Sequence, residues 1–123
     1  MELIKINKNI FKGKGKVSLP DGKITITTNY SLYIQKWIIK MGLINPQKLY
    51  EIMLTKEGAK ITSIIFQERE TDVNNNCFKV YMQQSNYLMS IVGLCKHYGI
   101  KPGRYPIVNL NNEGQTGFII NLN

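Results

Sequence analysis

The chain has few of the side chains that carry out catalysis or bind metals. Its 123 residues include one histidine, His97, and two cysteines, Cys77 and Cys95. Two cysteines are too few for a disulfide framework, and they do not have the spacing of a metal site. His97 has neither a nucleophile motif nor a second ligand beside it in the sequence. We therefore predict a protein that is not an enzyme, with no catalytic residue, no metal and no cofactor.

Phosphate-binding and carboxylate sites also lack support. The glycines and lysines at 13–16 (GKGK) are not followed by Ser or Thr and do not have the glycine spacing of a P-loop. Acidic residues are scattered singly, apart from Glu68, Glu70 and Asp72 in one polar segment. We therefore expect neither nucleotide binding nor catalysis by paired carboxylates.

Long apolar runs are absent as well. No stretch approaches the roughly 18 apolar residues typical of a membrane span, and Met1 does not begin a signal peptide. We expect a cytoplasmic location (the host cytoplasm if the chain is viral) and no membrane partner. A hydrophobic content of 43% with 20% charged residues is typical of an ordinary globular protein. At this length the chain should form one compact domain.

Negative charge is scarce, because 8 acidic residues face 16 lysines and arginines and leave a net charge of +8. Such an excess favours association with phosphate polyanions. It does not identify them, since low-GC and viral genomes also encode lysine- and asparagine-rich proteins through codon bias. Both explanations of the charge stay open at this point.

We interpret the segment 1–22 as a basic N-terminal extension or hairpin. Val17–Leu19 and Ile24–Ile26 alternate apolar and polar residues across Pro20-Asp21-Gly22, which is typical of a hairpin turn. The lysines and glycines before this hairpin fit either a phosphate-contacting arm or a solvated hairpin tip.

The segment 23–67 is the first predicted unit, a strand, a helix and a two-stranded hairpin. Asn29 has the character of a helix N-cap and Gly42 that of a helix stop. Between them, one helical face is predicted from the spacing of Ile34, Trp37, Ile38 and Met41. Two alternating strands follow, with Tyr50, Ile52 and Leu54 on one and Thr62, Ile64 and Phe66 on the other. We interpret the segment 68–77 as a polar linker.

The segment 78–123 repeats this pattern. Ile91, Leu94, Cys95 and Tyr98 follow their counterparts in the first helix at one constant offset, and the hairpin residues follow theirs at an offset shorter by one. One deletion in the break between helix and strand explains the change of offset. We interpret the chain as an internal duplication. Each half is too small to bury its own apolar faces, so the halves should cover each other as a pseudo-dimer.

The repeated unit resembles the AbrB/SpoVT-like swapped-hairpin (looped-hinge) superfamily, which includes MazE-type antitoxins and SymE-like proteins. The resemblance is carried by 98–103 (YGIKPG), by the strand Ile107–Leu110 and, more weakly, by 41–46 (MGLINP). It implies a fold that is mainly β with two short helices (α+β), in which duplicated β-α-β-β units form an intramolecular swapped-hairpin barrel with an extra N-terminal strand or arm. The chain departs from the family in lacking its adjacent arginines, so direct readout of guanine by arginine is not indicated.

The function that we predict is DNA binding without catalysis, as a small regulator or nucleoid-type binder, by a monomeric pseudo-dimer or a homodimer. An alternative is a protein-binding inhibitor, antitoxin-like or encoded by a phage or virus, that blocks another protein's nucleic-acid site. A third is a SymE-like toxin that acts on RNA. The candidate nucleic-acid-binding residues are the basic side chains Lys12, Lys14, Lys16, Lys23, Lys36, Lys40, Lys79, Lys96, Lys101 and Arg104.

Overall fold

The computed structural model describes residues 21–72, 76–112 and 115–122, and within them the fold is mainly β with two short helices. The helices are α2 (Lys36–Lys40) and α3 (Val92–Tyr98). The strands are β1 (Lys23–Ile26), β2 (Ser31–Ile34), β3 (Leu49–Glu57), β4 (Lys60–Arg69), β5 (Cys77–Lys79), β6 (Tyr81–Gln83), β7 (Asn86–Ser90), β8 (Gly103–Asn112) and β9 (Gln115–Asn121).

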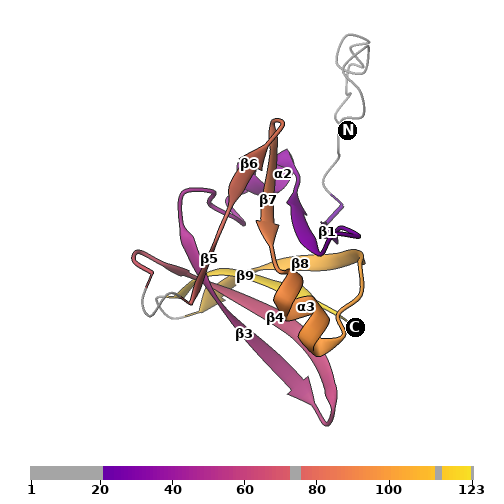
Figure 1. Cartoon of the computed structure of the whole chain (residues 1–123). Coiled ribbons are helices and arrows are strands. Elements are labelled where there is room, and N and C mark those ends of the chain that lie inside the picture. Colours follow the sequence, from indigo (N-terminus) through magenta and orange to yellow (C-terminus); the bar gives the residue numbers. More distant parts are fainter. Residues whose placement is uncertain (1–20, 73–75, 113–114, 123) are drawn as a thin grey trace, which may run out of the picture.

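The strands form one antiparallel sheet that curls into a nearly closed barrel (Figure 1). Their order is β5-β3-β4-β9-β8-β1-β2-β7-β6. The two strands at the ends of this order, β5 and β6, are separated in sequence by Val80 alone. Val80 is buried, and at this residue the chain passes directly from one end of the sheet order to the other. This continuity links the two edge strands along the chain, and since no pairing joins them the barrel is nearly closed.

The core fills the inside of the barrel because apolar residues alternate along each strand. Ile24 and Ile26 on β1, and Ile64 and Phe66 on β4, are at most 1% exposed. The ring of Phe66 stacks on that of Phe118, with centroids 4.3 Å apart. Each such side chain contributes roughly 1.5–3 kcal/mol by its burial, so the inward faces of the strands hold the barrel together.

Two strand pairings join segments that are far apart in the chain. In the β4–β9 pairing Ile64 lies opposite Ile120, and in the β2–β7 pairing Leu32 lies opposite Met89. The first strand, β1, pairs with β8 as well as with β2. The two halves of the chain are therefore interleaved and do not form separate layers.

The predicted start of the first helix was wrong. Ser31–Ile34 is strand β2, and α2 begins only at Lys36, after Gln35. Asn29 lies in the turn between β1 and β2, where the amide of Tyr30 donates to the carbonyl oxygen of Thr27. The spacing of Ile34 and Trp37 fits a helix, but pairing with β7 buries Leu32 and Ile34 along a strand, so tertiary contacts override the helical pattern.

The second helix, α3, begins at Val92, directly after the predicted face residue Ile91, and the segment before it, Asn86–Ser90, is strand β7. The predicted apolar faces hold only in part: Cys95 is buried, whereas Met41 is 65% and Tyr98 44% exposed. The predicted helix stops are confirmed. Gly42 and Gly99 take φ of 76° and 68°, a left-handed conformation that glycine adopts without strain.

Both predicted hairpins after the helices are confirmed, as β3–β4 and β8–β9. The predicted linker at 68–77 is too long at both ends, because β4 continues through Arg69 and β5 begins at Cys77. The extension at 1–20, including the predicted strand Val17–Leu19, lies outside the described residues.

Candidate nucleic-acid interface

Lys23 and Arg104 lie together on the outer surface where β1 pairs with β8. The burial pattern of β1 places Ile24 inside and Lys23 outside. Arg104 lies opposite Thr25 in this pairing, and its Nη1 donates to Thr25 Oγ1 at 3.0 Å. The pairing of two sequence-distant strands therefore brings two of the candidate basic residues to one place.

Asp21 holds the guanidinium of Arg104 in this position. Its carboxylate forms an ion pair with Arg104 and accepts a hydrogen bond of 3.1 Å from the backbone amide of Lys23. The amide of Lys23 is the largest cause that lowers the pKa of Asp21, and Arg104 lowers this pKa further. Asp21 is therefore negative at neutral pH and offsets part of the positive charge beside it.

Lys101 borders a hollow at the base of β8. The hydroxyl of Tyr105 donates to the backbone oxygen of Lys101 at 2.6 Å and fixes the turn between α3 and β8. A cavity of about 580 Å³ opens here between this turn and the β3–β4 hairpin, and its walls include Lys101, Lys60 and Glu57. The fold thus adds Lys60, which the sequence did not single out, to the surroundings of Lys101.

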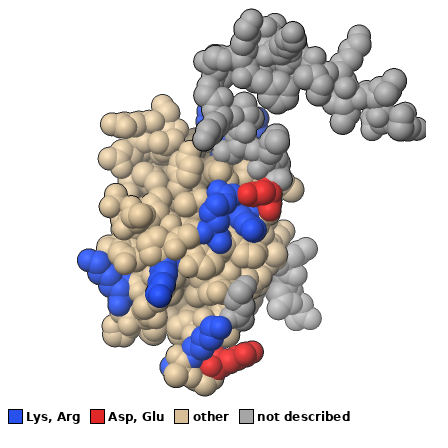
Figure 2. All heavy atoms as spheres, turned by 90° about the vertical axis from the view of Figure 1, so that its right-hand side faces the viewer, with Lys and Arg blue, Asp and Glu red and all other residues tan. Residues whose placement is uncertain are grey.

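The remaining candidates are exposed but belong to separate parts of the surface. Lys36 and Lys40 lie on α2, with Trp37 and Ile38 buried between them, as predicted for the polar face of this helix. Lys96 is in the last turn of α3, and Lys79 ends β5. Figure 2 shows basic side chains in separate groups on one face of the molecule, with acidic side chains beside some of them.

The structure therefore brings Lys23 and Arg104 together but does not gather all the candidate basic residues into one patch. Lys12, Lys14 and Lys16 lie outside the described residues.

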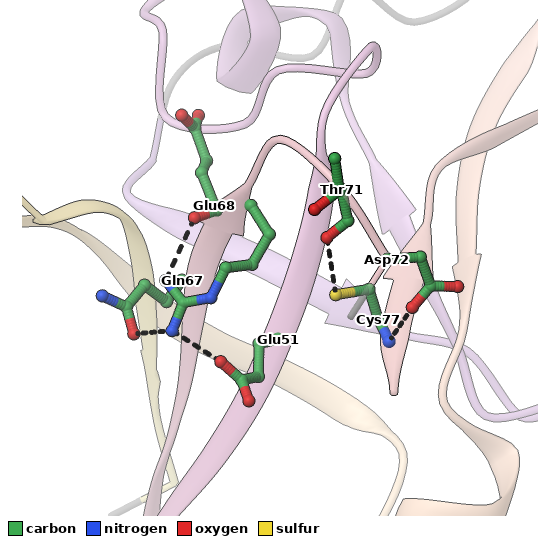
Figure 3. Close-up of polar contacts among 7 residues, drawn as sticks. Glu51, Gln67, Glu68, Thr71, Asp72 and Cys77 are labelled. Atoms are coloured by element: carbon green, nitrogen blue, oxygen red, sulfur yellow. Dashed lines mark hydrogen bonds and ion pairs between the residues drawn. The ribbon is translucent and has the colours of Figure 1, made fainter. Parts of the chain in front are cut away.

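Two other basic residues are already neutralised by acidic partners. Lys48 forms an ion pair of 2.5 Å with Glu70. Arg69 forms one of 2.5 Å with Glu51, and its guanidinium also donates to the side chain of Gln67 and the backbone of Glu68 (Figure 3). Pairing of this kind makes Lys48 and Arg69 less available for an external anion.

Acidic residues are unevenly distributed over the fold. Apart from Asp21, every acidic side chain in the described ranges belongs to β3, β4 or the turn that follows β4, namely Glu51, Glu57, Glu68, Glu70 and Asp72. The part of the barrel formed by β1, β2, β6 and β7 is therefore positive or neutral outside Asp21. Lys23 is the one charged side chain on these four strands.

The structure also aligns two tyrosines that the sequence did not identify as site residues. Successive strand pairings place five outward-facing residues in a row across β8, β1, β2, β7 and β6. We call it the tyrosine row: Arg104, Thr25, Tyr33, Leu88 and Tyr81. Tyr33 was missed because the segment was interpreted as a helix. The alternation of Leu32, Tyr33 and Ile34 was the signal that could have placed its ring outside.

The two cysteines differ in their surroundings. Cys95 is 1% exposed, and burial raises the pKa of its thiol to about 11, which confirms the predicted core position. The thiol of Cys77 donates to the backbone oxygen of Thr71, and its amide donates to Asp72 (Figure 3). No group of three or more potential ligands that could hold a metal occurs among the described residues.

No family model, curated protein or solved structure matches the chain. Neither α2 nor α3 is long and apolar enough to cross a membrane.

Proposed function

We propose that the protein binds nucleic acid without catalysis, through basic residues on the outer surface of a barrel built from two copies of one unit, in which strands precede a short helix and a hairpin follows it. The observation that carries this proposal is the contrast between two groups of cations. Lys23, Lys36, Lys40, Lys79, Lys96 and Lys101 are exposed and form no ion pair with another described residue, whereas Lys48, Arg69 and Arg104 are paired with acids. Unpaired, exposed lysines are free to neutralise phosphates and to release their counterions.

Strand pairing supports the proposed duplication. Ile64 lies opposite Ile120, and Leu32 lies opposite Met89. In each pair the second residue is the counterpart of the first in the other half of the sequence. An antiparallel pairing in which a residue faces its own counterpart is what a twofold axis between related halves produces. We infer that these two pairs lie on one pseudo-twofold axis through the barrel.

Hydrogen bonds at the helix ends support the same relationship. The amide of Leu43 donates to the oxygen of Ile38 at 3.1 Å, and the amide of Ile100 donates to the oxygen of Cys95 at 2.9 Å. Both bonds close the turn around a left-handed glycine, and their donors and acceptors are again counterparts in the two halves. In this proposal the halves interlock as in swapped-hairpin barrels, because β1 and β2 pair with β8 and β7 of the other half.

Charge reversal tests the proposed surface. Lys23→Glu combined with Lys101→Glu should abolish or greatly weaken binding to a DNA duplex and to a single strand at 50 mM salt. Lys48→Glu combined with Arg69→Glu is the matched control, because it makes the same change in net charge at two cations that already have acidic partners, and it should weaken binding far less. Equal losses in both variants would show that only net charge matters and would contradict this location.

Protein binding is a second candidate function, favoured by an apolar row on the other side of the barrel. Cross-strand pairing aligns Met53, Ile65, Ile119 and Val108 on the outer face of β3, β4, β9 and β8. Met53 and Val108, at the two ends of this apolar row, are 41% and 45% exposed. An apolar row of this kind suits a partner protein with a matching apolar surface.

Substitutions in the apolar row separate the two functions. If a protein partner binds there, Met53→Glu with Val108→Glu should abolish its capture in nuclease-treated extract, and Lys23→Glu with Lys101→Glu should leave capture intact. If nucleic acid is the ligand, the effects should be reversed in a binding assay with purified DNA.

A further inference from the structure

We propose that the tyrosine row binds single-stranded nucleic acid, with Tyr33 and Tyr81 stacking on bases while Lys23 and Lys79 contact phosphates. This inference rests on the proposed nucleic-acid binding and specifies its ligand class. Aromatic side chains on the open face of a sheet suit unpaired bases, because the bases of a duplex already stack on one another and turn only their edges outward.

The register places the two rings at a useful separation. Tyr33 lies opposite Leu88 on β7, and Leu88 lies opposite Tyr81 on β6, so one strand lies between the tyrosines. Neighbouring strands are about 4.8 Å apart, which puts the two tyrosine positions roughly 10 Å apart across the sheet. An extended strand can place two of its bases at such a separation, with the apolar side chain of Leu88 between them.

Exposure agrees with a stacking role. Tyr81 is 41% exposed and Tyr33 half-buried, and no described residue forms a hydrogen bond with either hydroxyl. The inward neighbours Leu32 and Ile34 are at most 1% exposed, so the core already fixes β2 without the ring of Tyr33. The outward rings therefore have apolar surface that the fold itself does not use.

Basic residues lie at both ends of the row. Arg104 begins it on β8, with Lys23 two positions from Thr25 on the same face of β1. At the other end, Lys79 is exposed two positions before Tyr81, and the intervening Val80 is buried, so both side chains point outward. A strand that follows the row thus meets a cation before and after the tyrosines. Asp21, beside Arg104, is paired with it.

Three probes are compared: a mixed-sequence DNA single strand, its duplex, and an RNA single strand of the same sequence. Each has about 12 nucleotides, a length within the usual range of single-strand sites. Binding is measured by fluorescence anisotropy in 50 mM salt. We expect both single strands to bind more tightly than the duplex. Tyr33→Leu and Tyr81→Leu should each weaken single-strand binding roughly 5- to 150-fold. A difference between the DNA and RNA arms identifies the sugar that is preferred.

Matched variants separate stacking from folding. Tyr33→Phe and Tyr81→Phe retain the ring and should bind single strands within about twofold of the unmodified protein. Tyr98→Leu removes an equally exposed tyrosine, 44% against 41%, from α3 and should have no effect. Duplex binding at least as tight as single-strand binding, or single-strand binding that the leucine variants leave unchanged, overturns the stacking role but leaves the proposed function standing. Failure of every probe to bind at 50 mM salt overturns the proposed function itself.

Discussion

Ile64 lies directly opposite Ile120 where β4 pairs with β9, and neither side chain is accessible to solvent. In the proposed duplication the two residues are counterparts in the two halves of the chain. Their contact joins the hairpin of the first half to that of the second, in the middle of the barrel. The stability of the whole barrel should therefore depend on both residues, and to a similar degree.

Truncation of either isoleucine tests this dependence. Ile64→Ala and Ile120→Ala should each lower the free energy of unfolding by about 2–5 kcal/mol, because each leaves a cavity in a packed core. Urea denaturation measures the loss, and the double variant should depart from additivity because the side chains are paired. A loss below about 1 kcal/mol in either variant would contradict a shared core at this point.

Gly117 should not tolerate a side chain. A Cβ added there would lie 1.8 Å from the backbone oxygen of Phe66, which belongs to the adjacent strand and cannot move away without breaking the pairing. Gly117→Ala should therefore unfold the protein or lower its melting temperature sharply. Gly93→Ala is the control: a Cβ there would meet nothing within 4 Å, and Gly93 is in α3, so this change should be neutral or stabilise by up to about 1 kcal/mol.

The sequence was sufficient to predict the strands of both hairpins and the glycines that end the helices. The alternating apolar residues in these hairpins fit a strand and not a helix, because no helical spacing matches them. They are Tyr50, Ile52 and Leu54 on β3, and Ile64 and Phe66 on β4. The sequence from Ser31 to Met41, by contrast, is compatible with both a strand and a helix.

Between Ser31 and Met41, the apolar residues before Gln35 have the spacing of a strand, and those after it have the spacing of a helix. Pairing with β7, a strand from the other half of the chain, decided between them. The same limit applies to the candidate site. Exposed lysines can be counted in the sequence, but the row that joins Tyr33 to Tyr81 exists only because successive strand registers align.

Burial of Cys95 makes stability depend on pH in alkaline solution. Its pKa is raised from 9.0 to about 11, so between these values the unfolded chain has lost the thiol proton that the folded protein retains. The stabilisation is complete below pH 9 and is lost as pH rises towards 11, by about 1 kcal/mol at pH 10. Urea denaturation of the unmodified protein and of Cys95→Val at pH 8 and pH 10 measures it. The difference in unfolding free energy between the two proteins should shrink at pH 10, and a constant difference would contradict the burial.

Asp21 should restrain nucleic-acid binding, because its carboxylate neutralises Arg104. Asp21→Asn removes this charge and frees the guanidinium for phosphate, so affinity for a DNA strand at 50 mM salt should rise several-fold. Glu70→Gln makes the same change in net charge and frees Lys48, which is not part of the proposed surface, so it should raise affinity less. Anisotropy titrations of both variants test this, and an equal gain would show that the location of the charge is irrelevant.

The most direct test of nucleic-acid binding is the salt dependence of the association constant for a DNA single strand, measured between 50 and 200 mM salt. If Lys23, Lys79 and Lys101 each neutralise a phosphate, log K should fall linearly with log salt with a slope of about −2 or steeper. Lys23→Gln should make that slope shallower by somewhat less than one. A slope near zero, or no binding at 50 mM salt, would contradict the account.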